Sequence, residues 1–126
     1  MIVLDTHAWV WLVDAPDRLG KAARQALRSS KPRGVAAVSC WEVAQLASRD
    51  RVRLDRDVVS WMEDGLKEEG IELVPLTPAV AGAAARLGRL QDPADRLVVA
   101  TALVHGADLV TADARIADAG LLRTIW

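Results

Sequence analysis

Four acidic side chains occupy similar places in the chain, each directly after a short apolar run or in the first turn of an expected helix. They are Asp5, Glu42, Asp95 and Asp113. The carboxyl ends of parallel strands lie side by side, so acids placed in this way converge on one edge of a sheet. Grouped carboxylates repel one another unless a cation lies among them, and Mg²⁺ or Mn²⁺ prefers oxygen ligands of this kind. The sequence therefore predicts a divalent metal site formed by these four acids.

A site of this kind suits the hydrolysis of a phosphodiester. That reaction needs neutralisation of charge on the phosphate and a nucleophile stronger than water, and a bound divalent cation provides both. We expect Asp5 and Asp95 to ligate the cation directly. Asp113 would ligate it or orient one of its waters, and Glu42 would hold a second ion or the attacking water. Helix N-termini at the same edge would add partial positive charge that attracts a phosphate.

The elements expected around these acids alternate between strand and helix. Short apolar runs predict strands over residues 2–4, 35–38, 71–76, 108–111 and 122–125. Helical periodicity or helix-start signals appear between them, over residues 7–13, 19–27 and 58–66 and after Ser39, Thr77 and Asp92. Strands separated by helices imply a parallel sheet with helices on both faces. We predict one domain over residues 1–126, an α/β fold with three layers (α/β/α) around a central, mostly parallel, five-stranded sheet.

Each acid also has a simpler explanation as part of a helix cap. Ser39 and Glu42 have the spacing of a capping box, and Asp92 as an N-cap would place Asp95 in the first turn of the next helix. The other two acids are suited to capping the short helices that follow them. Taken singly, capping explains each acid better than catalysis. Taken together the acids favour a site, because chance caps would be spread over both edges of the sheet.

Composition limits the other classes of protein. The chain has 126 residues, 52% of them hydrophobic, which suffices for one real core. The single cysteine, Cys40, excludes an internal disulfide and fits a reducing, cytoplasmic setting. The longest strongly apolar stretch, residues 97–104, is too short to cross a bilayer, so we expect no membrane association. A net charge of −1 gives no global attraction to nucleic acid, so any RNA contact must come from local arginines and a metal.

Four short motifs occur in order along the chain. They are Asp5-Thr6 after an opening apolar strand, Ser39-x-Trp41-Glu42, Asp92-Pro-x-Asp95-Arg96 and Thr111-x-Asp113. The ordered set resembles the PIN-domain family, and in particular the VapC-type toxins of bacterial toxin–antitoxin pairs. The resemblance implies a Mg²⁺- or Mn²⁺-dependent endoribonuclease with the four acids as its acidic set. It also implies a homodimer, and a cognate antitoxin that covers and inhibits the site.

Three residues beside the acids have two possible roles. The hydroxyls of Thr6 and Ser39 are suited to orienting a metal water or a phosphate, and equally to local cap or turn bonds. Arg96 is placed to contact a substrate phosphate or to pair with a site acid, although a surface ion pair is the default. Four further arginines, within residues 49–56, interleave with aspartates, which favours a salt-bridged, solvated face over an RNA track.

The aromatic residues are five tryptophans, with no tyrosine or phenylalanine. We expect Trp41 to pack in the core and fix the acid-bearing helix, and Trp61 to be a core residue. Trp9 and Trp11 lie in one short helix and cannot point the same way, so one of them is a candidate for contact with a partner.

Two further functions remain open from the residues. One is a related nuclease with a housekeeping role in RNA processing, which would share every site residue. The other is a non-catalytic α/β binding module in which the acids only cap helices.

Overall fold

A five-stranded parallel sheet forms the centre of the molecule. The computed structural model describes residues 1–30 and 32–126. The strands are β1 (Ile2–Leu4), β2 (Arg33–Ala36), β3 (Ile71–Val74), β4 (Asp108–Val110) and β5 (Thr124–Ile125). They are ordered β3-β2-β1-β4-β5, and every neighbouring pair is parallel. The prediction of a mostly parallel five-stranded sheet is therefore confirmed, and the first strand of the chain lies at its centre.

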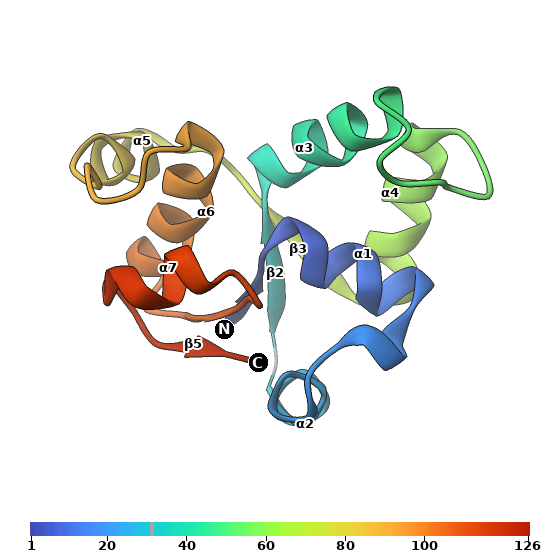
Figure 1. The fold of residues 1–126 in the computed structure, drawn as a ribbon, viewed down its shortest axis with the longest axis horizontal. Helices are drawn as coiled ribbons and strands as arrows, with labels where there is room; N and C mark the ends of the chain where they lie inside the picture. The colour runs from blue at the N-terminus through green and yellow to red at the C-terminus, as the bar shows by residue number, and fades with distance from the viewer. Residues whose placement is uncertain (31) are drawn as a thin grey trace.

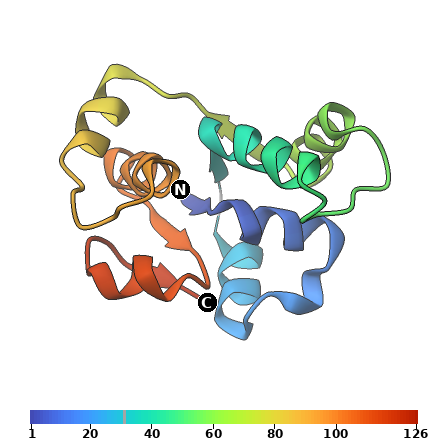
Figure 2. The ribbon, with the colours of Figure 1, turned by 45° about the horizontal axis from the view of Figure 1, so that its top comes forward.

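Helices cover both faces of this sheet (Figure 1). On one side lie α1 (Thr6–Asp14), α2 (Lys21–Ser29), α3 (Ala37–Ser48) and α4 (Val58–Glu68), with a short 3₁₀ turn at Pro16–Arg18. On the other lie α5 (Pro78–Ala85), α6 (Pro93–Val104) and α7 (Ala114–Ala119). The rotated view in Figure 2 separates the same two groups. This is the predicted three-layer α/β/α architecture.

The side chains of β1 alternate between two hydrophobic cores, as the two-residue period of a strand requires. Ile2 and Leu4 join the core formed with α1 to α4, which contains Trp9 and Trp61. Val3 points to the opposite core, which is formed with α5, α6 and α7. β1 is thus buried on both faces. The residues that directly follow this strand therefore lie between the two helical layers.

The junction between β2 and α3 differs from the expected one. The structure ends β2 at Ala36 and begins α3 at Ala37, so Val38 is helical although we predicted a strand through that residue. No glycine, proline or capping residue separates strand from helix here, and Val38 packs against the core under α6 from its helical position. Tertiary packing therefore overrides the strand preference of a β-branched residue.

Three other strands are shorter than expected. β4 ends at Val110, one residue before Thr111. β3 ends at Val74, before Pro75, which has no backbone N–H to donate to a neighbouring strand. β5 contains only residues 124 and 125. Across residues 1–30 and 32–126, no helix is long and apolar enough to cross a membrane.

Candidate functional site

Two of the predicted acids, Asp5 and Asp113, follow adjacent strands of the sheet. The backbone N–H of Asp5 donates to the Val110 carbonyl at the end of β4, at 3.0 Å. Both acids also cap helices: Oδ1 of Asp5 accepts from the Ala8 N–H at 2.8 Å, and Oδ1 of Asp113 accepts from the Arg115 N–H at 2.9 Å. Helix capping and a place at the strand edge are therefore compatible for the same side chain.

Glu42 has a different environment from the one that a capping box would give it. Because α3 begins at Ala37, Ser39 lies inside the helix, and the N-cap position is held by Ala36, which has no capping group. The capping-box interpretation of Ser39 and Glu42 is therefore wrong. Instead, Glu42 Oε1 lies 2.5 Å from the hydroxyl of Thr6, and that hydroxyl is 2.9 Å from the hydroxyl of Ser39.

The direction of these two hydrogen bonds follows from their chemistry. An ionised carboxylate only accepts, so Thr6 donates its single proton to Glu42. Ser39 must then donate to Thr6. Both hydroxyl residues are buried, with exposed fractions of 4% for Thr6 and 0% for Ser39. The result is a buried chain from α3 through α1 and back to α3 that fixes the Glu42 carboxylate.

Asp92 and Asp95 stand at the start of α6. Oδ1 of Asp92 accepts from the Ala94 N–H at 2.8 Å and the Asp95 N–H at 3.4 Å, so the prediction that Asp92 is the N-cap is confirmed. Asp95 lies in the first turn, as expected, with a side chain that is 18% exposed.

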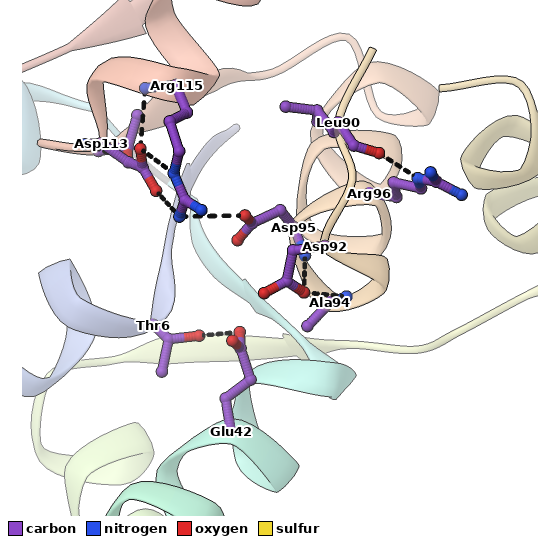
Figure 3. A network of polar contacts seen from close by, with 10 residues as sticks. Thr6, Glu42, Leu90, Asp92, Ala94, Asp95, Arg96, Asp113 and Arg115 are labelled. Atoms are coloured by element: carbon purple, nitrogen blue, oxygen red, sulfur yellow. Dashed lines mark hydrogen bonds and ion pairs between the residues drawn. The ribbon is translucent and has the colours of Figure 1, made fainter. Parts of the chain in front are cut away.

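All four predicted acids line a single pocket of about 620 Å³. Figure 3 shows Glu42 beside Thr6, Asp95 on α6 and Asp113 at the start of α7, with their side chains directed into one region. The pocket wall contains three further charged residues, Arg51, Asp92 and Arg115, to which sequence reasoning gave no place in the metal site. The sequence suggests only a capping role for Asp92, although its position three residues before Asp95 places both acids on one helix turn.

The pocket concentrates negative charge in a partly dry space. Burial raises the pKa values of Asp5 and Glu42 above the ordinary carboxylate range. Burial, reinforced by the charge of Asp92, raises the pKa of Asp95 to about 6. Asp113 behaves differently, because hydrogen bonding from Arg115 lowers the pKa of its carboxyl. Three of the four acids therefore resist ionisation when no cation is present.

Arg115, and not Arg96, is the arginine that reaches the acids. Its Nη2 lies 2.7 Å from Asp113 Oδ2 and 3.5 Å from Asp95 Oδ2, and its Nε lies 3.2 Å from Asp113 Oδ1. Arg96 instead donates to the Leu90 carbonyl, on the side of α6 away from the pocket (Figure 3). Among the described residues Arg96 forms no ion pair, neither with a site acid nor with another surface residue, and it does not line the pocket. Its contact with a substrate phosphate stays a prediction. The signal for Arg115 was its spacing, two residues after a helix-capping aspartate.

The arginines of residues 49–56 divide between two environments. Arg56 forms ion pairs of 2.8 Å with both Asp55 and Asp64, as the salt-bridged interpretation predicts. Arg51 is exposed and lines the acidic pocket.

The tryptophans differ widely in how deeply they are buried. Trp61 is buried as expected, and its indole N–H donates to Asp14 at 3.1 Å. Trp9 is fully buried, whereas Trp11 is half-buried against Trp126. The expectation for Trp41 is wrong, because its exposed fraction is 58%.

The carboxylates of the pocket suit a divalent cation that keeps part of its water shell. Within residues 1–30 and 32–126, no three histidine, cysteine or acidic side chains lie close enough to form a complete metal cage. Mg²⁺ does not require such a cage, because it keeps several waters and is usually held by one or two carboxylates together with substrate phosphate oxygens. Spaced, partly buried carboxylates with raised pKa values therefore fit this kind of cation.

Comparison with known proteins extends this description. The sequence matches the PIN domain over residues 2–122. It is 41% identical over 117 residues to ribonuclease VapC22 of Mycobacterium tuberculosis, covering 91% of this chain and 88% of that protein.

Two crystal structures have a similar fold. VapBC2 from Rickettsia felis, bound to a DNA fragment from the promoter, has a TM-score of 0.69 at 13% identity and covers 98% of this chain and 97% of its own. FitAcB from Neisseria gonorrhoeae has a TM-score of 0.61 at 23% identity and covers 98% and 96%.

The two crystal structures are similar to this chain in fold. The PIN domain match and the 41% identical relative are similarities of sequence, and each spans most of the chain. The resemblance drawn from the four ordered motifs agrees with them. The chain therefore belongs to the PIN domain family.

Proposed function

We propose that this protein is a divalent-metal-dependent endoribonuclease that hydrolyses RNA phosphodiester bonds. The observation that carries the proposal is the pocket in which Asp5, Glu42, Asp95 and Asp113 meet from four different parts of the chain. The raised pKa values of three of these acids support it, because a cation would relieve their repulsion. The relative VapC22, which is named a ribonuclease, supports the reaction class.

In the proposed reaction the acids have separate roles. Asp5 and Asp95 hold Mg²⁺ or Mn²⁺ directly, and Asp113 joins them or orients a water. Glu42, fixed by the Thr6 hydroxyl at 2.5 Å, positions the attacking water. When bound, the cation supplies charge neutralisation at the phosphate and acidifies the attacking water. Thr6 and Ser39 act through Glu42, so we assign them positioning roles and assign none to Arg96.

The alternative of a binding module with purely structural acids has support from one set of contacts. Asp5, Asp92 and Asp113 do accept hydrogen bonds from backbone N–H groups at helix starts. Capping does not account for Glu42, which accepts from a buried hydroxyl of another helix. We therefore favour the nuclease.

We further propose that the nuclease is the toxin of a toxin–antitoxin pair, works as a homodimer and is inhibited by an antitoxin. The similar solved structures include complexes described as toxin–antitoxin, such as one from Klebsiella pneumoniae. The exposed ring of Trp41 precedes Glu42 and lines the adjoining pocket with Leu46, which supplies an apolar anchor next to the acids for a covering partner. Growth arrest on expression, reversed by co-expression of a neighbouring small gene, would support the toxin. Normal growth would favour the housekeeping RNA-processing alternative.

The test of the nuclease uses amide variants that keep side-chain shape. We expect Asp5→Asn, Asp95→Asn and Glu42→Gln to lose Mn²⁺ uptake in calorimetry and cleavage of structured RNAs, while circular dichroism stays unchanged. Asparagine still caps a helix, so Asp5→Asn separates capping from metal binding. The matched control is Asp108→Asn, since Asp108 lies at the amino end of β4, on the opposite edge of the sheet, and pairs only loosely with Arg123 at 3.4 Å. RNA cleavage by the three site variants at the parental rate would refute the proposal.

A further inference from the structure

Arg115 holds a position that a divalent cation in the proposed site would need. Asp113 Oδ2 accepts from Arg115 Nη2 at 2.7 Å, and Asp113 Oδ1 accepts from both the Arg115 N–H and its Nε. The same Nη2 also reaches Asp95 at 3.5 Å. One guanidinium therefore contacts two of the acids, and it occupies both oxygens of Asp113 (Figure 3).

The arginine is held by charge and not by packing. Its side chain is 72% exposed, so few contacts other than those with the acids fix its position. Ion pairs at this degree of exposure contribute little to stability, and a divalent cation brings twice the charge to the same carboxylates. The pairing can therefore form without a metal and yield when one arrives.

The displaced guanidinium would remain at the rim of the pocket. Arg115 lies in the first turn of α7, and its side chain lines the pocket together with Asp5 and Asp95. Guanidinium is suited to bidentate contact with phosphate oxygens. A phosphate that approaches a cation among these acids would pass within reach of this side chain.

We propose that Arg115 is an internal counter-cation that occupies the acidic pocket in the metal-free protein, competes with the divalent metal for Asp113, and binds an RNA phosphate once displaced. This inference rests on the proposed function and adds a residue that couples metal loading to RNA binding. It makes Arg115 a positioning residue before the metal binds and a substrate contact afterwards.

The competition is tested by Mn²⁺ calorimetry on the full chain. We expect Arg115→Gln to bind Mn²⁺ about threefold to tenfold more tightly than the parent, the range that a weak ion pair can supply. Arg123→Gln is the matched control, because Arg123 is 76% exposed and pairs with Asp108 at 3.4 Å, away from the pocket. Arg115→Lys keeps the charge but cannot span both oxygens of Asp113. If the guanidinium of Arg115 directly occupies the metal position, Arg115→Lys should bind Mn²⁺ with an affinity between those of the parent and Arg115→Gln. If only its positive charge matters, Arg115→Lys should bind Mn²⁺ as tightly as the parent does.

The phosphate contact is tested by fluorescence anisotropy with a short labelled single-stranded RNA, titrated with and without Ca²⁺ as a cation that replaces Mg²⁺. We expect the cation to strengthen RNA binding more in the parent and in Arg123→Gln than in Arg115→Gln. An equal gain in all three proteins would overturn the phosphate contact.

The outcomes separate this inference from the function on which it rests. Equal Mn²⁺ affinity in the parent and Arg115→Gln, with both binding the metal, would overturn the role of Arg115 alone. If neither protein takes up Mn²⁺, the metal site and this inference both fail. Because the side chain of Arg115 is exposed, we expect its variants to keep the fold, and circular dichroism checks this directly.

Discussion

At the scale of single residues, the hydroxyl of Thr6 is the contact that most directly controls a site acid. Groups that orient a functional side chain typically change activity tenfold to a hundredfold when removed. We therefore expect Thr6→Val, which keeps the shape and loses the hydroxyl, to lower the RNA cleavage rate by about tenfold. Thr6→Ser should restore most of it, because serine still donates to Glu42.

The control for Thr6 is a buried threonine outside the pocket. Thr101 is 2% exposed, and its hydroxyl donates to the Leu97 carbonyl within α6 at 2.7 Å. Thr101→Val tests the general effect of losing a buried hydroxyl and should leave cleavage near the parental rate. A loss of cleavage in Thr101→Val equal to that in Thr6→Val would mean that positioning of Glu42 is not the cause.

At the scale of elements, two errors of sequence reasoning fall in α3. The Ser39-x-x-Glu42 pattern matches a capping box, but nothing local in the sequence reveals that the helix has already begun at Ala37. Once Ser39 and Val43 are known to face inward, Trp41 must point outward, because two residues along a helix are about 200° apart. The helical spacing between Trp41 and Val43 is the same for either helix start, so the expectation for the tryptophan was wrong because it followed the apolar character of the ring and not its place on the helix.

Strand and helix identities were otherwise predictable, because they depend on local signals. Thr77 before Pro78 and Asp92 before Pro93 do form the expected N-caps of α5 and α6. The end of β3 depends on Pro75, which is also visible in the sequence. What local signals could not supply is the partner of each polar side chain, since Thr6 and Glu42 are 36 residues apart.

The exposed and buried tryptophans of adjacent elements should differ strongly in their effect on stability. Trp61 in α4 is 1% exposed, packs against Trp9 with ring centroids 5.5 Å apart, and donates to Asp14. We expect Trp61→Ala to lower the free energy of unfolding by about 3–5 kcal/mol, the usual cost of removing a large buried aromatic side chain. Trp41→Ala should change it by less than about 0.5 kcal/mol, as for an exposed surface position.

Urea denaturation followed by circular dichroism measures both values without relying on tryptophan fluorescence. A large loss of stability in Trp41→Ala would mean that the ring is covered within the chain. If Trp41→Ala keeps its stability and cleavage but escapes inhibition by a co-expressed antitoxin, the ring belongs to the partner surface proposed above.

At the scale of the whole molecule, the sheet topology gathers acids from both helical layers. Asp5 and Asp113 follow the neighbouring strands β1 and β4, while Glu42 comes from α3 in one layer and Asp95 from α6 in the other. The convergence could be predicted because parallel strands share a carboxyl edge. The role of Arg115 could not, because it depends on a side-chain conformation that folds back over the helix start.

This gathering of charge should make the stability of the metal-free protein depend on pH. The folded-state pKa of Asp95 is about 6, above its ordinary value of 3.8, and burial is the main cause. Between these two values the folded protein binds more protons than the unfolded chain, so this group's contribution to stability is present at low pH and is lost as the pH rises through about 6. Asp5 and Glu42, whose pKa values are also raised, act in the same direction. The lowered pKa of Asp113 acts in the opposite direction and only in more acidic solution.

We therefore expect the melting temperature in EDTA to fall between about pH 4 and pH 6, and to fall less in Asp95→Asn, which cannot ionise at this position. Millimolar Mn²⁺ should raise the melting temperature at about pH 7 by several degrees, since a ligand at a hundred times its Kd stabilises by about 2.7 kcal/mol. The rise should shrink toward pH 5, because the acids must release protons to bind the metal. Differential scanning fluorimetry of the parent, Asp95→Asn and the distant control Asp108→Asn measures all three effects. Equal pH slopes in the parent and Asp95→Asn would place the source of the dependence elsewhere. A response to Mn²⁺ that Asp95→Asn retains in full would exclude Asp95 as a ligand, and with it a site that joins the two helical layers.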